Sequence, residues 1–232
     1  MASNVIDEPA YRDRRFMFKD RLHAGELLAI KLKGYVDKEN AQLLAIPAGG
    51  VPVGYMVARG LGVPLDVIVV RKVQIPWNPE AGFGAVVWDG TVILNEPLVG
   101  QLGLSTDLVQ WCISKTQEGV GERFEKFRGG KPPPDLRDKN VILVDDGLAS
   151  GFTMLAAVKS VRNQGPEKVI VAVPTASASA VQLVAPSVDK LVCLNIRGGP
   201  FFAVADAYQK WYDLSDEEVV EFLKRADLKD DV

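Results

Sequence analysis

Two adjacent carboxylates, Asp145 and Asp146, directly follow an apolar run at residues 141–144 and precede a turn of small residues. A continuous apolar run is typical of a buried parallel strand, and ligands of open α/β sheets bind outside the carboxyl ends of such strands. The two carboxylates are therefore predicted at a ligand-binding edge. There they can accept hydrogen bonds from sugar hydroxyls or hold a hydrated Mg²⁺ ion.

The turn after the carboxylates, residues 147–153, combines glycines with hydroxyl side chains. Gly147 and Gly151 allow the backbone to turn tightly, and Ser150 and Thr153 stand where the next helix is expected to begin. Free backbone N–H groups at a helix start form a nest of positive potential that suits a phosphate. A structural turn needs only one capping side chain, so it explains less of the pattern. The segment is predicted to bind a sugar phosphate.

Residues 141–154 resemble the signature of type I phosphoribosyltransferases that binds 5-phosphoribosyl 1-diphosphate (PRPP). The resemblance implies that Asp145 and Asp146 are catalytic and bind the 2′- and 3′-hydroxyls of ribose, directly or through Mg²⁺. Ala149 stands where the 6-oxopurine enzymes usually have Asp, which disfavours hypoxanthine and guanine as acceptors. The implied 5′-phosphate site consists of Gly147, Ala149, Ser150, Gly151, Phe152 and Thr153.

A second anion site is predicted at Ala48, Gly49 and Gly50, between an expected strand at residues 43–47 and a helix ending near Leu61. Backbone N–H groups in such a turn can face an anion, and glycine allows it to approach closely. A purely structural turn is the alternative. The family resemblance places the diphosphate of PRPP at this turn.

Arg71 and Lys72 follow an expected strand at residues 65–70, where similar enzymes carry a basic pair, and the resemblance implies that they bind diphosphate and assist its departure. The alternative is a charged loop boundary. Residues 73–87 are expected to form a lid that excludes water. This segment has no Lys or Arg, and Glu80 is its one ionisable residue. That departure favours a second function, a PRPP or nucleotide sensor without turnover; a ribosyl-phosphate hydrolase is a third.

The hood that recognises the base is predicted in the N-terminal arm, residues 1–40, and the C-terminal segment, residues 195–232. Phe201 or Phe202 could stack on a planar base, with Arg197 as a polar contact. These residues could equally belong to the core. The aromatic residues farther along the chain are predicted to be structural: Tyr208, Trp211 and Tyr212.

Composition bounds the class of protein. The chain has 232 residues and a net charge of −3, which predicts one domain over 1–232 and no broad nucleic-acid-binding face. Cys112 and Cys193 are too few for a disulfide framework, so a reducing, cytoplasmic location is expected. His23 is expected to be structural. There is no apolar run of the roughly 20 residues that span a bilayer, and no signal-peptide pattern at the N-terminus.

Alternating strands and helices predict a parallel sheet with right-handed crossovers. The fold expected from this pattern and the resemblance is an α/β type I phosphoribosyltransferase fold, with helices on both faces, a small hood and a flexible loop. Its implied activity is Mg²⁺-dependent transfer of the phosphoribosyl group to a nitrogen acceptor, such as a nucleobase in nucleotide salvage. Similar proteins are commonly homodimers. The remaining expected elements are helices at 16–33, 105–127, 151–163, 177–184 and 215–225, strands at 168–173 and 190–195, a hairpin at 85–94, a long loop at 74–84 and a connector at 129–135.

Overall fold

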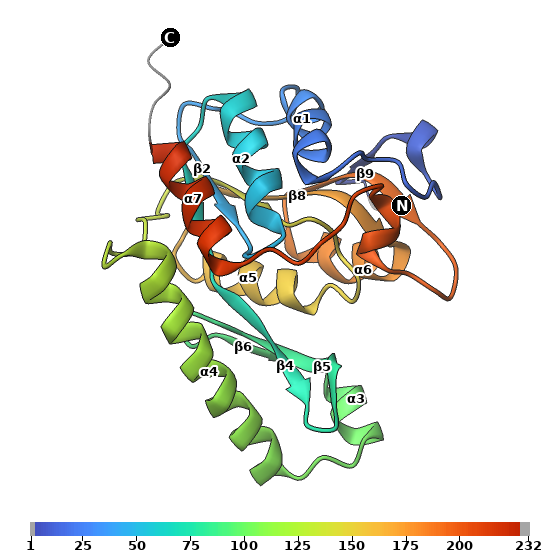
Figure 1. Cartoon of the computed structure of the whole chain (residues 1–232), viewed down its shortest axis with the longest axis vertical. Coiled ribbons are helices and arrows are strands. Elements are labelled where there is room, and N and C mark those ends of the chain that lie inside the picture. The colour runs from blue at the N-terminus through green and yellow to red at the C-terminus, as the bar shows by residue number, and fades with distance from the viewer. Residues whose placement is uncertain (1–2, 228–232) are drawn as a thin grey trace.

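The computed structural model describes residues 3–227, and a parallel β-sheet lies at its centre (Figure 1). Within these residues the sheet has six strands. They are β1 Val5–Asp7, β2 Ala41–Ala45, β3 Leu65–Val67, β7 Asn140–Val144, β8 Lys168–Ser177 and β9 Lys190–Arg197. Their order across the sheet is β1-β9-β8-β7-β2-β3, and all neighbours pair in parallel. The sheet brings the carboxyl ends of β2 and β7 side by side.

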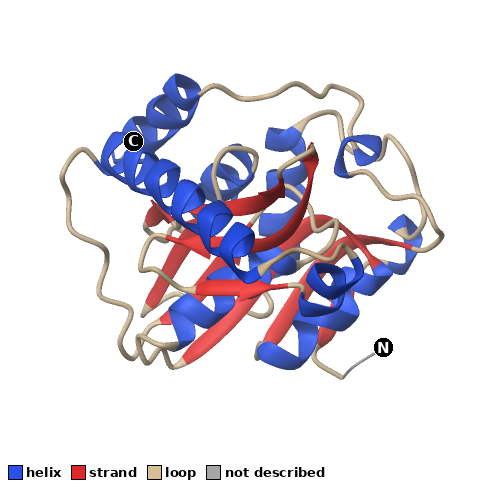
Figure 2. Ribbon diagram, turned by 90° about the horizontal axis from the view of Figure 1, so that it is seen from below, coloured by secondary structure: helices blue, strands red, loops and turns tan. Residues whose placement is uncertain are grey.

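Helices cover both faces of this sheet, which confirms the predicted fold class (Figures 1 and 2). Successive residues of β7 enter different cores: Ile142 packs on one side of the sheet and Leu143 on the other. This two-sided burial explains the uninterrupted apolar run of the strand. No helix in residues 3–227 has the length and apolarity to cross a membrane. One face carries α1 Arg21–Leu32, α2 Gly50–Leu61 and α7 Asp216–Asp227, and the other carries α5 Phe152–Arg162 and α6 Ala178–Val184.

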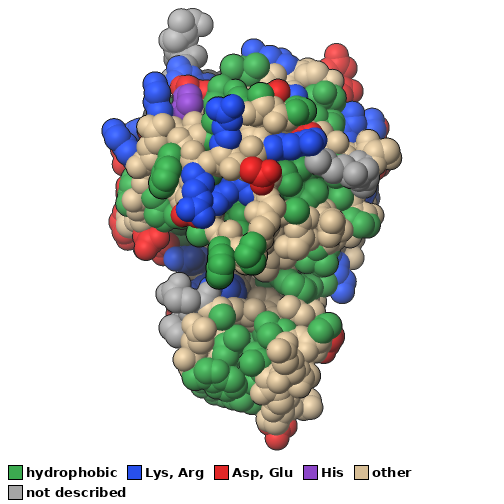
Figure 3. Space-filling model, turned by 90° about the vertical axis from the view of Figure 1, so that its right-hand side faces the viewer, with side chains coloured by type: hydrophobic (Ala, Val, Ile, Leu, Met, Phe, Trp, Pro, Cys, Tyr) green, Lys and Arg blue, Asp and Glu red, His purple; other side chains and the backbone are tan. Residues whose placement is uncertain are grey.

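A smaller part projects from the main sheet (Figures 1 and 3). Its antiparallel sheet is formed by β4 Val70–Ile75, β5 Asn78–Val87 and β6 Val92–Leu94. Helices α3 Glu96–Gln101 and α4 Thr106–Arg128 complete it. The predicted hairpin around Asp89 and Gly90 is confirmed, because Val86 faces Val92 across an antiparallel pair.

The prediction of a long loop at residues 74–84 is wrong, because β4 and β5 form a hairpin there. Gly82 lies where the two strands approach closely, because a Cβ at this position would lie 2.2 Å from Lys72 Cγ. Register shifts beside Gln74 absorb the irregular sequence. The expected single strand at 65–70 is also wrong, since β3 ends at Val67 and β4 begins a different sheet at Val70.

The two predicted parts of the hood pair with each other. Phe18 and Tyr208 form a parallel bridge, and the Phe18 N–H donates to the carbonyl oxygen of Ala207 at 2.9 Å. Strand β1 belongs to the N-terminal arm and pairs with β9, with Ile6 opposite Val192. Three residues are too few to show a strand period, so the sequence did not predict β1.

The other predicted helices are present, with bounds that differ by a few residues. Helix α1 is shorter than expected, and β8 and β9 extend two or more residues beyond their predicted ends. Ser105 caps α4, where its side chain accepts from the Leu108 N–H. The predicted connector at 129–135 has no helix or strand.

Ser215 should stabilise α7 through a capping box. Its Oγ accepts from the Glu218 N–H at 3.2 Å, and Glu218 Oε2 accepts from the Ser215 N–H at 2.9 Å. We expect Ser215→Ala to lower the free energy of unfolding by about 1 kcal/mol. Chemical denaturation should show this loss. Ser114 is exposed within α4 and caps no helix, so Ser114→Ala should cause no loss of stability. Equal stabilities of the two variants would contradict the capping role.

Candidate active site at the carboxyl edge of the sheet

Asp145 and Asp146 lie directly beyond β7, at the predicted edge. All five residues of β7 are buried, so the strand fixes where the acidic pair begins. Asp145 Oδ1 accepts from the Asp146 N–H at 2.8 Å, and the Asp146 carbonyl oxygen accepts from Tyr208 Oη at 2.6 Å. The backbone of the acidic pair is therefore held from two sides.

Burial and mutual proximity disfavour negative charge on both carboxyl groups. Burial raises the pKa of Asp145 well above its ordinary value, and the charge of Asp146 raises it further. Burial also raises the pKa of Asp146, although Arg21 opposes that rise. A cationic ligand at this edge would favour the ionised form of both groups.

The loop after the acidic pair presents backbone donors. Leu148 ties it to β8, because its N–H donates to the Thr175 carbonyl oxygen at 3.0 Å and its carbonyl oxygen accepts from the Ser177 N–H at 2.9 Å. Gly151 has φ +85° and starts α5. Within the described residues, the N–H groups of residues 149–153 donate no hydrogen bond. These backbone donors stand next to the acidic pair, and the phosphate site assigned to them stays a prediction.

The turn between β2 and α2 lies directly against the acidic pair. A Cβ on Gly49 would lie 1.8 Å from Asp146 Oδ2, and one on Gly50 would lie 2.8 Å from the Val144 carbonyl oxygen. Glycine is needed at both positions because the two loops touch. The peptide bond between Pro47 and Ala48 is cis. The structure thus brings the predicted diphosphate loop and the predicted ribose site together.

Arg21 completes this cluster, and sequence reasoning did not single it out. Its Nε donates to Asp146 Oδ2 at 2.9 Å, and its Nη1 donates to the Tyr212 carbonyl oxygen at 2.8 Å. Its guanidinium carbon lies 3.8 Å from the centre of the Trp211 ring. One feature of the sequence could have indicated this residue. Arg21 lies in the first turn of α1, where its positive charge interacts unfavourably with the helix dipole, so it is expected to serve a purpose other than stabilising the helix.

Arg71 and Lys72 do not end a strand of the main sheet, contrary to the prediction. They are inner residues of β4, in the smaller part of the molecule. The Arg71 guanidinium packs against α4, because a Cβ on Gly119 would lie 2.1 Å from Arg71 Nη1. Both residues line a cavity of about 300 Å³ with Trp111 of α4. Their role towards diphosphate stays a prediction.

The three predicted hood residues divide into two kinds. Arg197 is buried and donates to the Ala203 carbonyl oxygen at 3.1 Å, and its guanidinium lies over the Phe202 ring at 5.1 Å. Phe201 is 83% exposed. The Arg197 side chain is thus engaged within the hood, whereas Phe201 has a face open to a ligand. On the face in Figure 3, Lys and Arg side chains lie mostly on the main body above the smaller part.

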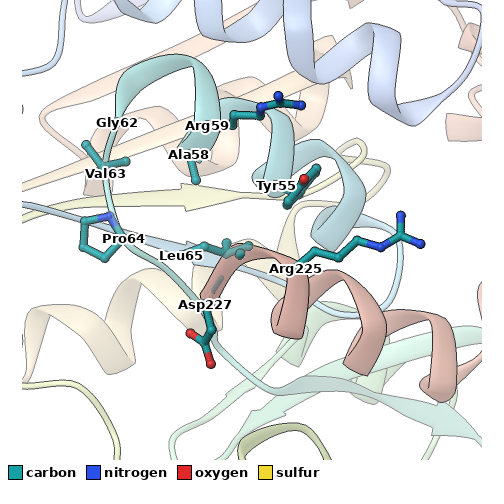
Figure 4. A pocket seen from close by; sticks show the side chains of 10 residues that line it. Tyr55, Ala58, Arg59, Gly62, Val63, Pro64, Leu65, Arg225 and Asp227 are labelled. Atoms are coloured by element: carbon teal, nitrogen blue, oxygen red, sulfur yellow. The ribbon is translucent and has the colours of Figure 1, made fainter. Parts of the chain in front are cut away.

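A cavity of about 750 Å³ lies elsewhere, between the carboxyl end of α2 and α7 (Figure 4). Tyr55, Arg59 and Arg225 are among the residues that line it. The Tyr55 ring also packs against the Phe222 ring, with ring centres 5.5 Å apart and ring planes at 56°. The cavity reaches Pro64 and Leu65 at the start of β3, so it lies at the amino end of that strand. None of the predicted site residues lines it.

The sequence matches that of a known protein family over most of its length. The family is described as phosphoribosyl transferase domain, and the match covers residues 19–205. Proteins of Mycobacterium tuberculosis strains CDC 1551 and H37Rv, provisionally named phosphoribosyl transferases, are each 39% identical over 210 residues. These residues are 90% of this chain and 47% of each relative. The chain therefore spans about half the length of these curated relatives.

Among solved structures, the TT1426 protein of Thermus thermophilus is similar over nearly its whole length. The TM-score is 0.74 at 36% sequence identity, and the match covers 90% of this chain and 99% of the other. The shared fold thus includes both the main sheet and most of the remaining chain.

Proposed function

The chain belongs to the phosphoribosyl transferase domain family, and we propose that it transfers the phosphoribosyl group of PRPP to a nitrogen acceptor, with release of diphosphate. The observation that supports this most directly is the juxtaposition at the end of β7. Asp145 and Asp146 are followed at once by the N–H nest of residues 149–153 and are touched by the glycine turn at residues 48–50. A sugar between two phosphate groups matches this order of acceptors and donors.

Each part of the site has a distinct task in the proposed reaction. The carboxylates orient the ribose hydroxyls, the nest holds the 5′-phosphate, and the backbone of residues 48–50 holds the diphosphate. The acceptor nitrogen bonds to ribose C1 while the bond from C1 to the diphosphate oxygen breaks, and its electron pair leaves with diphosphate. The acceptor proton passes to solvent. In this proposal the hairpin of β4 and β5 and the hood exclude water from C1.

Mg²⁺ fits the donors at the edge. Typically Mg²⁺ is held by one or two carboxylates together with substrate phosphates, and Asp145 and Asp146 supply that number. In residues 3–227 there is no cluster of three or more His, Cys, Asp or Glu residues that could hold a metal ion. A bound cation would lower the pKa of both carboxyl groups and so stabilise their charged forms. When bound, the ion would neutralise charge on the diphosphate.

The acceptor proposed is a nucleobase other than hypoxanthine or guanine, in nucleotide salvage. Ala149 lacks the carboxylate that would meet a 6-oxopurine, and exposed Phe201 offers a stacking surface. We place the protein in a reducing cytoplasm, since Cys112 and Cys193 are both buried and unpaired. A homodimer remains our expectation.

A regulator that binds PRPP without turnover is the second candidate. Arg71 is packed against α4 by the close approach of its guanidinium to Gly119, which favours this reading because the leaving diphosphate would lack that cation. A ribosyl-phosphate hydrolase is a third and weaker candidate, which requires a site open to water.

Diphosphate release should distinguish these functions. We expect release from PRPP with Mg²⁺ and one member of a panel of purines, pyrimidines and amines, and much slower release from the Asp145→Asn variant at the same PRPP concentration. PRPP binding without release for any acceptor would indicate the regulator. Ribose 5-phosphate formed without an acceptor would indicate the hydrolase. A wild-type protein that does not bind PRPP would contradict the proposal.

A further inference from the structure

We propose that Arg21 is the positioning residue that sets the Asp146 carboxylate for the ribose of PRPP, and so joins the ribose site to the hood; this inference rests on the proposed function. Arg21 begins α1, whose first turn is capped by Asp20. The side chain is 8% exposed and pairs with an Asp146 side chain that is 13% exposed. The pair is thus largely shielded from solvent, where an ion pair is stronger than at the surface.

The Arg21 guanidinium is fixed on three sides. It donates to Asp146 and to the Tyr212 carbonyl oxygen, and it stacks on Trp211. The planar fork of arginine satisfies all three contacts at once, whereas the single ammonium of lysine cannot. The position of Arg21 is therefore set by the hood and not by the carboxylate alone.

Asp146 is held against the diphosphate loop by the same contact. Its Oδ2, which accepts from Arg21, is also the atom nearest to the position of a Cβ on Gly49. Tyr208 of the hood holds the backbone of the same aspartate through its carbonyl oxygen. A change in Arg21 would release the carboxylate, while the anion nest at residues 149–153 has its own tie to β8, because the Ala149 carbonyl oxygen accepts from Ser177 Oγ at 2.7 Å.

The chain offers a matched control for a buried arginine. Arg128 is also buried, pairs with Asp66 and lies over the Trp88 ring at 5.6 Å. Its contacts reach β3 of the main sheet through Asp66, the connector carbonyl oxygens and the aromatic rings of the smaller part, and they do not include the acidic pair. Arg128→Lys and Arg21→Lys therefore remove the same chemical group from similar surroundings, and only Arg21→Lys disturbs Asp146.

The test compares ligands with and without a ribose. We expect Arg21→Lys to weaken binding of PRPP and ribose 5-phosphate, measured with Mg²⁺ by calorimetry, by about tenfold or more. Binding of inorganic phosphate, followed by NMR, should be unchanged, and Arg128→Lys should affect none of these ligands. Unchanged binding of the ribose ligands, or an equal loss for inorganic phosphate, would overturn the proposal.

Two further measurements complete the test. If Arg21→Lys does not fold, Trp211→Leu keeps the ion pair but removes the stacked ring, and it should weaken ribose 5-phosphate binding by about threefold. Unchanged binding by that variant would then overturn the proposal. A wild-type protein that binds neither ribose ligand would instead contradict the proposed function itself.

Discussion

Replacement of Asp145 by Asn should lower the affinity for PRPP by about tenfold to a hundredfold. A ribose hydroxyl would lose a charged hydrogen-bond acceptor, or a bound Mg²⁺ ion would lose a charged ligand. The fold should persist, since the asparagine oxygen can still accept from the Asp146 N–H. Isothermal titration with Mg²⁺ measures the affinity, and thermal unfolding measures the stability.

Asp135→Asn is the matched control for this change. Asp135 is exposed in the connector, and its Oδ1 accepts a backbone N–H from Arg137, much as Asp145 Oδ1 accepts one from Asp146. The PRPP affinity of the Asp135→Asn variant should equal that of the wild type. Equal affinities of all three proteins would refute the assignment of Asp145 to the ribose.

Asp146→Asn is a less direct test of the ribose site. It would leave the buried Arg21 without its charged partner, and breaking a buried ion pair typically costs about 3–5 kcal/mol of stability. The double variant of Asp145 and Asp146 should abolish PRPP binding, but part of that loss would come from the lost ion pair. Asp145→Asn avoids the difficulty.

Gly49→Ala should reduce PRPP affinity and slow diphosphate release by about a hundredfold, because an error of about 1 Å in a catalytic geometry can cost that much in rate. The added Cβ would lie 1.8 Å from Asp146 Oδ2, so the carboxylate or the turn must move. The backbone is not the obstacle, since Gly49 has φ −62° and ψ −32°, which alanine adopts readily. Stability should fall by about 1–3 kcal/mol from overpacking.

Gly121→Ala provides the control for this substitution. Gly121 lies within α4, and a Cβ there would meet nothing within 4 Å. Alanine at such a site should leave PRPP affinity unchanged and stabilise the protein by about 0.5–1 kcal/mol. A Gly49→Ala variant with full PRPP affinity would show that the contact between the two loops does not matter for binding.

The local parts of the candidate site follow from the amino-acid sequence. The apolar strand, the two carboxylates and the loop proposed to bind phosphate are contiguous at residues 141–154, so their order along the chain already sets their order in space. The alternation of strands and helices likewise predicted the parallel sheet. Both depend on local periodicity and on glycine at turns, and these are visible in a single chain.

Which distant residues meet depends on how the segments pack in the folded chain. Arg21 and Asp146 are 125 positions apart, and the contact of Gly49 with Asp146 exists only because β2 and β7 are neighbours in the sheet. The hairpin of β4 and β5 was not predicted for a related reason. Its glycines, Gly82 and Gly84, allow neighbouring strands to approach closely and do not mark a loop. Local patterns give each segment its conformation, but the free energy gained from packing segments together selects their partners.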